Sequence, residues 1–175
     1  MQHGVIIEIP CKYYIGVFLE NNCGSPADIS NFPDLNEKLR FWLIKHPEEY
    51  RVLSKIYEQN TVKIIIPENW AELFGISITR ANIREFNRIV ELKLKAKLHQ
   101  YMKFKCSTGC SVASGIRDFQ NEFCMPEVAW SFESIKKELA RKAELKLRDR
   151  ILLTRLCIFI LLFFIDSYLI WSNLN

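Results

Sequence analysis

An apolar segment near the C terminus constrains this chain more than any other feature. Leu156 to Ile165 is a run of ten apolar residues, and residues 151–171 contain only two charged side chains. A transmembrane helix needs about 20 predominantly apolar residues. The segment therefore predicts an apolar helix that is either a membrane anchor or a buried terminal helix of a soluble fold. A chance extension of the reading frame would leave the same pattern.

Two charged residues oppose insertion of this segment. Arg155 and Asp166 each cost about 2.5 to 3.5 kcal/mol at the centre of a bilayer, although Arg155 lies near the end and can extend to the interface. They fall about three helical turns apart on one face, where a homo-oligomer could supply a polar partner. Tyr168 and Trp171 suit an interfacial belt. Eight basic residues between Lys136 and Arg155 precede the apolar run that starts at Leu156, which predicts a cytoplasmic domain anchored to the inner membrane.

The rest of the chain has the composition of a packed domain. Of 175 residues, 49% are apolar and 13% aromatic, which excludes wholesale disorder. The N terminus lacks the pattern of a signal peptide, so export by that route is not expected. We predict a mostly helical α+β fold with a small sheet that includes two short strands. Its parts are a compact domain of residues 1–130, a basic helix of residues 131–150 and an apolar helix of residues 151–171, which is the candidate transmembrane anchor.

Two β-branched runs predict the strands. Val5 to Ile9 is followed by Pro10, and the similar run from Val62 to Ile66 is followed by Pro67. Proline has no backbone N–H to donate to a ladder, so it suits a position where the chain leaves a sheet. The two strands are expected to pair with each other.

Helical spacing of apolar residues follows the first strand. A helix is expected from Cys11 onward, and Gly24 can end it with a positive φ. Asp34 is expected to cap a second helix, and Pro47 to begin another after the second ends. The apolar face predicted for the second helix consists of Leu35, Leu39, Trp42 and Leu43.

The longest helix is predicted in the second half of the domain. Residues 67–78 are expected to be irregular, after which Ser77 or Thr79 caps a helix that ends near Phe104. A further helix is expected over residues 112–124. The core-facing stripe predicted for the long helix, in steps of three and four residues, is Ile83, Phe86, Val90, Leu94, Leu98 and Tyr101.

Positive charge is concentrated in two stretches. Residues 79–105 carry eight basic and two acidic side chains, and residues 131–155 carry eight and four. Such concentration attracts nucleic-acid phosphate or anionic lipid. On the long helix, side chains within about 80° of one another form a basic stripe that could follow a phosphate backbone or could be an ordinary solvated face. The residues of this stripe are Arg80, Arg84, Arg88 and Lys95.

The region from Val112 to Arg150 has the order of a helix-turn-helix. The helix G-I-R-D-F-Q-N-E-F is followed by a break at C-M-P-E-V-A-W and then by S-F-E-S-I-K-K-E-L-A-R-K. The second helix would read base edges with its first turns. The break between the two helices is longer than the usual turn of this motif. A solvated surface helix with i,i+4 charge pairs would account for the same charged residues. The candidate nucleic-acid contacts are Ser131, Ser134, Lys136, Lys137, Arg141 and Lys142.

Few patterns point to catalysis or to a metal. The six cysteines are unevenly spaced, and most are expected to be small buried hydrophobic side chains. Cys106 and Cys110 could supply two corners of a zinc site, completed by Cys124, Cys23 or His99. The chain has no Gly-rich phosphate loop and no H-E-x-x-H or G-x-S-x-G motif. We therefore expect no cofactor and no enzymatic activity.

A resemblance agrees with this reading. The motifs I-E-I-P and V-K-I-I-I-P, the aromatic helix between them, and I-R-D-F-Q-N-E-F followed by S-F-E-S-I-K-K-E-L-A-R-K resemble small uncharacterised proteins of mobile elements and phages of gut bacteria. The resemblance covers roughly residues 5–142. It implies a soluble chain without known catalytic or binding residues, and the apolar tail departs from it.

Charge and element order favour a non-enzymatic protein that binds nucleic acid through its basic helices, and the resemblance implies that it is an accessory protein of a mobile element. The alternative is a membrane-tethered adaptor, in which the same Lys and Arg residues orient the tail and lie against anionic lipid.

Overall fold

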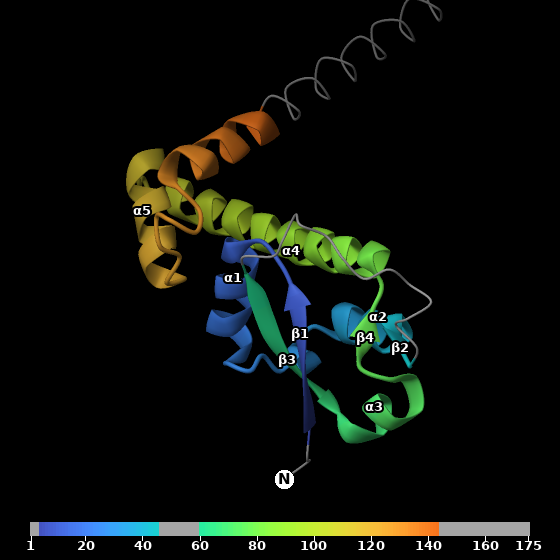
Figure 1. Cartoon of the computed structure of the whole chain (residues 1–175). Coiled ribbons are helices and arrows are strands. Elements are labelled where there is room, and N and C mark those ends of the chain that lie inside the picture. The colour runs from blue at the N-terminus through green and yellow to red at the C-terminus, as the bar shows by residue number, and fades with distance from the viewer. Residues whose placement is uncertain (1–3, 46–59, 144–175) are drawn as a thin grey trace, which may run out of the picture. The chain divides into compact units, whose positions relative to one another are not determined.

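The computed structural model describes residues 4–45 and 60–143, which Figure 1 shows in colour. The chain divides into two compact units, Met1–Phe132 and Glu133–Asn175. Most of the regular structure is helical, and the strands form two small antiparallel sheets, so the prediction of a mostly helical α+β fold is confirmed. The apolar helix predicted over residues 151–171 and the helix expected to begin at Pro47 lie outside the described residues.

Strands β1 (Gly4–Pro10) and β3 (Thr61–Pro67) form an antiparallel ribbon in which Ile7 pairs with Ile64. Both predicted strands and their pairing are confirmed, and each strand ends at its proline. Alternation along the strands directs one face into the core. The side chains on that face are Ile7, Ile9, Val62, Ile64 and Ile66, all at most 4% exposed.

Helices α1 (Tyr13–Cys23) and α2 (Pro33–Trp42) follow β1, with a short 3-10 helix, η1 (Ile29–Asn31), between them. Gly24 ends α1 with a φ of 82°, as predicted. The predicted cap of α2 is wrong, because Phe32 is its N-cap and Asp34 lies inside the first turn. Pro33 occupies the first helical position, where its missing N–H removes no hydrogen bond.

Three short elements differ from the prediction. The stretch expected to be irregular contains α3 (Glu68–Phe74) and β4 (Ser77–Ile78), and Leu43, expected on the face of α2, belongs to β2 (Leu43–Ile44). Helix α3 is only seven residues long and buries none of them, so its sequence is too short for a repeated apolar period to reveal it. Strands β2 and β4 pair over two residues each, which is too short for a visible alternation.

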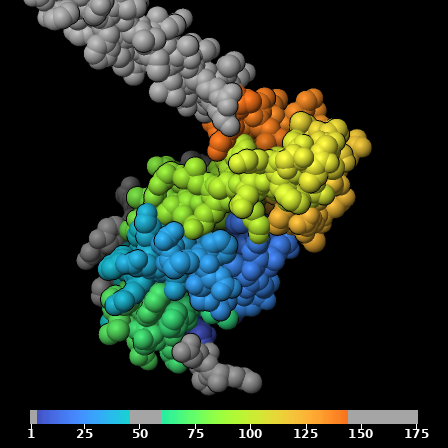
Figure 2. Space-filling view, turned by 180° about the vertical axis from the view of Figure 1, so that it is seen from behind, coloured from blue at the N-terminus to red at the C-terminus, as the bar shows by residue number. Residues whose placement is uncertain are grey.

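Helix α4 (Arg80–Ser107) is 28 residues long. Its N-cap is Thr79, whose side chain accepts a hydrogen bond from the Asn82 N–H. Its predicted stripe is buried, except that Tyr101 is half-buried and Met102 occupies the core instead. Figure 2 shows α1 and α2 side by side beneath α4. Helix α5 (Val112–Glu122) packs on the C-terminal half of α4, and residues 132–143 form a further helix.

Candidate nucleic-acid interface

The first two turns of α4 present positive charge. Arg80 and Arg84 are exposed, and their guanidinium groups make no hydrogen bond or ion pair with any described residue. Both lie near the N-terminal end of the helix, where the aligned peptide dipoles add a partial positive charge. This end of α4 can therefore attract an anion through side chains and backbone together.

The other two members of the predicted stripe are neutralised. Arg88 donates from Nε and Nη2 to the two carboxylate oxygens of Glu85, at 2.6 and 2.7 Å. Lys95 Nζ lies 2.8 Å from Glu91 Oε1. The stripe is therefore divided, and only its first half has charge that no described carboxylate offsets.

Glu91 is the centre of a partly buried network. It accepts a hydrogen bond of 2.7 Å from Lys12 Nζ, which also lies 3.0 Å from the Tyr14 hydroxyl. Burial alone would raise the pKa of Glu91, but hydrogen bonds from Lys12 and Lys95 outweigh it and lower that pKa to about 2. Burial raises the pKa of Tyr14 to about 12. At neutral pH the Glu91 carboxylate is therefore ionised and the Tyr14 hydroxyl keeps its proton, so neither group is poised to exchange a proton there.

A buried amide, that of Asn87, is hydrogen-bonded to the backbone of Lys12, a member of this network. Asn87 is 3% exposed, and its Oδ1 accepts a hydrogen bond of 3.2 Å from the Lys12 N–H. Its Nδ2 donates to the carbonyls of Pro10 and Ile83, at 3.0 and 2.8 Å. Asn87 thereby fixes the junction between β1 and α1 against α4, and its role is structural.

The helix of residues 132–143 carries the second group of candidates. Lys136, Lys137, Arg141 and Lys142 are all exposed. Arg141 Nη2 lies 2.9 Å from Glu138 Oε2, and Lys136 Nζ lies 3.8 Å from Glu133 Oε1, whereas Lys137 and Lys142 pair with no described carboxylate.

The second group does not form a single face. At 100° per residue, Ser134, Lys137 and Arg141 lie within about 60° of one another, while Lys136 and Lys142 lie about 100° to either side. One phosphate backbone cannot meet all four basic side chains at once. The face of Lys137 and Arg141, which also carries Ser134, is the part that can follow one strand.

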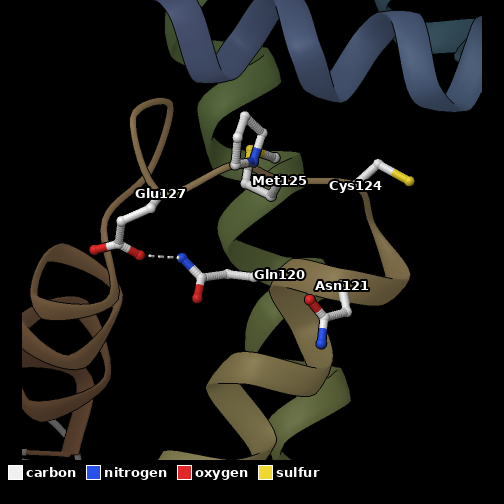
Figure 3. Close-up of a pocket in the computed structure, with 6 residues that line it drawn as sticks. Gln120, Asn121, Cys124, Met125 and Glu127 are labelled. Atoms are coloured by element: carbon white, nitrogen blue, oxygen red, sulfur yellow. Dashed lines mark hydrogen bonds between the residues drawn. The ribbon is translucent and has the colours of Figure 1, made fainter.

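The segment before this helix contains a pocket that the sequence did not indicate. Its volume is about 520 Å³. Figure 3 shows the residues that line it, at the end of α5 and in the loop that follows. Gln120 Nε2 donates to Glu127 Oε2 at 2.9 Å, and the Glu127 carboxylate also accepts from the Phe132 N–H. These polar groups fix the start of the following helix. The pocket is lined by Gln120, Asn121, Cys124, Met125, Pro126 and Glu127.

The cysteines correct one expectation. Cys11 is buried, and burial raises its pKa to about 12, but Cys23 and Cys110 are half-buried and Cys106 and Cys124 are exposed. Both exposed thiols lie where a helix leaves the core, at the end of α4 and just after α5. Within the described part of the chain, no three His, Cys, Asp or Glu residues lie close enough to hold a metal ion.

Comparisons of the chain with protein-family models, with curated proteins and with solved structures gave no match. Among residues 4–45 and 60–143, none of the helices has the length and apolar character that a membrane crossing requires. The predicted anchor, residues 151–171, lies outside that part of the chain.

Proposed function

We propose that this protein is a non-enzymatic accessory protein, of the kind carried by mobile elements, that binds nucleic acid through α4 and the helix of residues 132–143. One observation carries the proposal. Four of the predicted basic contacts are exposed and offset by no carboxylate among the described residues: Arg80, Arg84, Lys137 and Lys142.

Unpaired cations favour a phosphate partner for a physical reason. A basic side chain that is free of a carboxylate can neutralise a phosphate and release its condensed counterion. Arg88 and Arg141 must first give up an ion pair within the protein, so their net contribution is smaller. Contacts of this kind give affinity and orientation without reading the base sequence.

Salt dependence of duplex DNA binding tests the proposal. The full chain, kept in solution with a mild detergent, should bind more weakly as the salt concentration rises. The logarithm of the binding constant, plotted against the logarithm of the salt concentration, should have a slope of about −0.9 for each phosphate contact. Replacing Arg80, Arg84, Lys137 and Lys142 together by Ala should reduce the slope by about 2 to 3 units, because Lys137 and Lys142 lie about 140° apart around their helix and one phosphate backbone meets only one of them. Binding with an unchanged slope would refute the assignment.

Lys103→Ala is the matched control. Lys103 is exposed on the same helix but lies about 140° around the axis from Arg80, so its loss should leave the slope unchanged. A second variant, which lacks only Arg88 and Arg141, should lose less than half as much slope as the four-residue variant. A loss of half or more would show that overall charge, and not this set of side chains, determines binding.

A membrane-tethered adaptor is the second candidate, and the apolar residues 151–171 after a basic stretch favour it. Co-sedimentation with vesicles of neutral lipid alone separates the two. Co-sedimentation that is lost when residues 151–175 are removed would support the anchor, while DNA binding measured on the same samples tests the first proposal independently.

A further inference from the structure

The ribbon of β1 and β3 has one open edge. Cys11 N–H donates to the Asn60 carbonyl at 3.0 Å, so this pair and every second pair before it are the hydrogen-bonded pairs of the ladder. Val5, Ile7 and Ile9 therefore direct their backbone groups toward β3. Gly4, Ile6 and Glu8 direct theirs to the other side of β1, where they bond to no described backbone.

Two contacts agree with this alternation of backbone direction along the strands. The Pro10 carbonyl, which by the same rule points away from β3, accepts its hydrogen bond from Asn87 Nδ2. On the opposite edge of the ribbon, Ala27 donates to the Lys63 carbonyl and accepts from the Ile65 N–H. The outer edge of β3 is thus covered at Ala27, and β1 is the edge that stays open among the described residues.

A groove runs beside the open edge. Its volume is about 210 Å³, smaller than the roughly 300 to 1,000 Å³ typical of small-molecule sites. In Figure 1 the C-terminal half of β1 lies beside β4, whose residues Ser77 and Ile78 line the other side of the groove. Each wall therefore belongs to a strand of a separate two-stranded sheet. The residues that line the groove are Glu8, Ile9, Pro10, Ile76, Ser77, Ile78 and Ile83.

The side chains along the open edge and the groove combine one acid with exposed apolar groups. Glu8 is exposed and forms no ion pair with a described residue, although Lys63 is its neighbour in the ribbon. Ile6 is 52% exposed on the same face of the ribbon, and Ile76, on the opposite wall, is 57% exposed. A strand added here would place a residue opposite Ile6 and another, two positions away, opposite Glu8.

We propose that this groove binds an extended peptide segment of a partner protein, which adds as a strand along β1 and carries a basic side chain opposite Glu8 and an apolar one opposite Ile6. Open backbone groups select an extended chain, and the unpaired carboxylate selects its charge. This binding site is separate from the basic helices and does not depend on nucleic-acid binding.

A synthetic peptide of sequence T-K-T-I-T-K-T tests the proposal, because it places Ile and Lys correctly in either strand direction. Amide hydrogen exchange of the full chain is measured by NMR in mild detergent. The peptide should slow exchange at Ile6 and Glu8 and leave Ile7 and Ile9 unchanged, since those two already bond to β3. Absence of new protection at Ile6 and Glu8 at millimolar peptide would overturn the proposal.

Two control peptides separate strand addition from simple charge attraction. T-E-T-I-T-E-T should bind about two- to fivefold more weakly than the lysine peptide, because a Glu and not a Lys would lie opposite Glu8, and Glu8→Lys should reverse that preference. Because Glu8 is exposed, this variant is expected to fold normally. The lysine peptide with N-methylated backbone amides should lose binding, and retention of binding would refute strand addition. Concentration-dependent protection of Ile6 and Glu8 without peptide would show instead that a second copy pairs with this edge.

Discussion

Lys12 Nζ lies 2.7 Å from Glu91 Oε2, although the two residues are 79 positions apart in the sequence. Lys12 directly precedes α1, and Glu91 lies in the middle of α4, so this ion pair joins the beginning of the domain to its longest helix. Glu91 also neutralises Lys95. One carboxylate thus stabilises the fold and removes a cation from the predicted nucleic-acid surface.

Glu91→Gln should make stability less dependent on pH. The pKa of Glu91 is lowered from 4.5 to about 2 in the folded chain, so its contribution is complete above pH 4.5 and is lost as pH falls toward 2. After allowance for solvent screening, we expect the variant to lose about 1 kcal/mol of unfolding free energy at pH 7 and little at pH 2. Urea titrations at several pH values measure this difference. Asp34→Asn, which removes an exposed partner of Lys93, should show no such pattern.

Asn87→Ala should destabilise the domain by about 2 to 4 kcal/mol, because it leaves the Lys12 N–H and the Pro10 carbonyl without their partner in a buried site. Chemical unfolding with circular dichroism measures the loss. Asn36→Ala, at a half-buried position in α2, is the control and should stay within about 0.5 kcal/mol of the parent. A similar loss from both variants would contradict the structural role of Asn87.

Gly75→Ala should cost more than Gly109→Ala, although both glycines have positive φ values, 95° and 87°. At Gly75 an added Cβ would overlap the backbone of Ile44 and Lys45, whereas at Gly109 it would meet nothing within 4 Å. We expect about 1 kcal/mol for Gly109→Ala from backbone strain, and at least about twice that for Gly75→Ala. Thermal unfolding of the two variants provides the comparison. Equal losses would show that β2 can move away from Gly75.

Local patterns in the sequence predicted the elements that carry their own signal. The runs ending at Pro10 and Pro67 gave both strands of the ribbon, and apolar steps of three and four residues gave the face of α4 from Ile83 to Leu98. Thr79 was one of two predicted caps and is the residue that makes the bond. Each of these signals depends on residues close together in the chain, so a sequence can reveal it.

The short elements and the state of the charges were decided only by tertiary structure. Helix α3 and strands β2 and β4 are too short to have a period, and they are held by neighbours such as Ile44, which lies against Gly75. Counting charges could show that Arg80 and Lys95 are basic. It could not show that Glu91 would form ion pairs with both Lys95 and Lys12. Sequence determines which residues can be charged or apolar, while the pairing of distant segments determines which charges remain free and which strand edge stays open, because both depend on distances that only the folded chain defines.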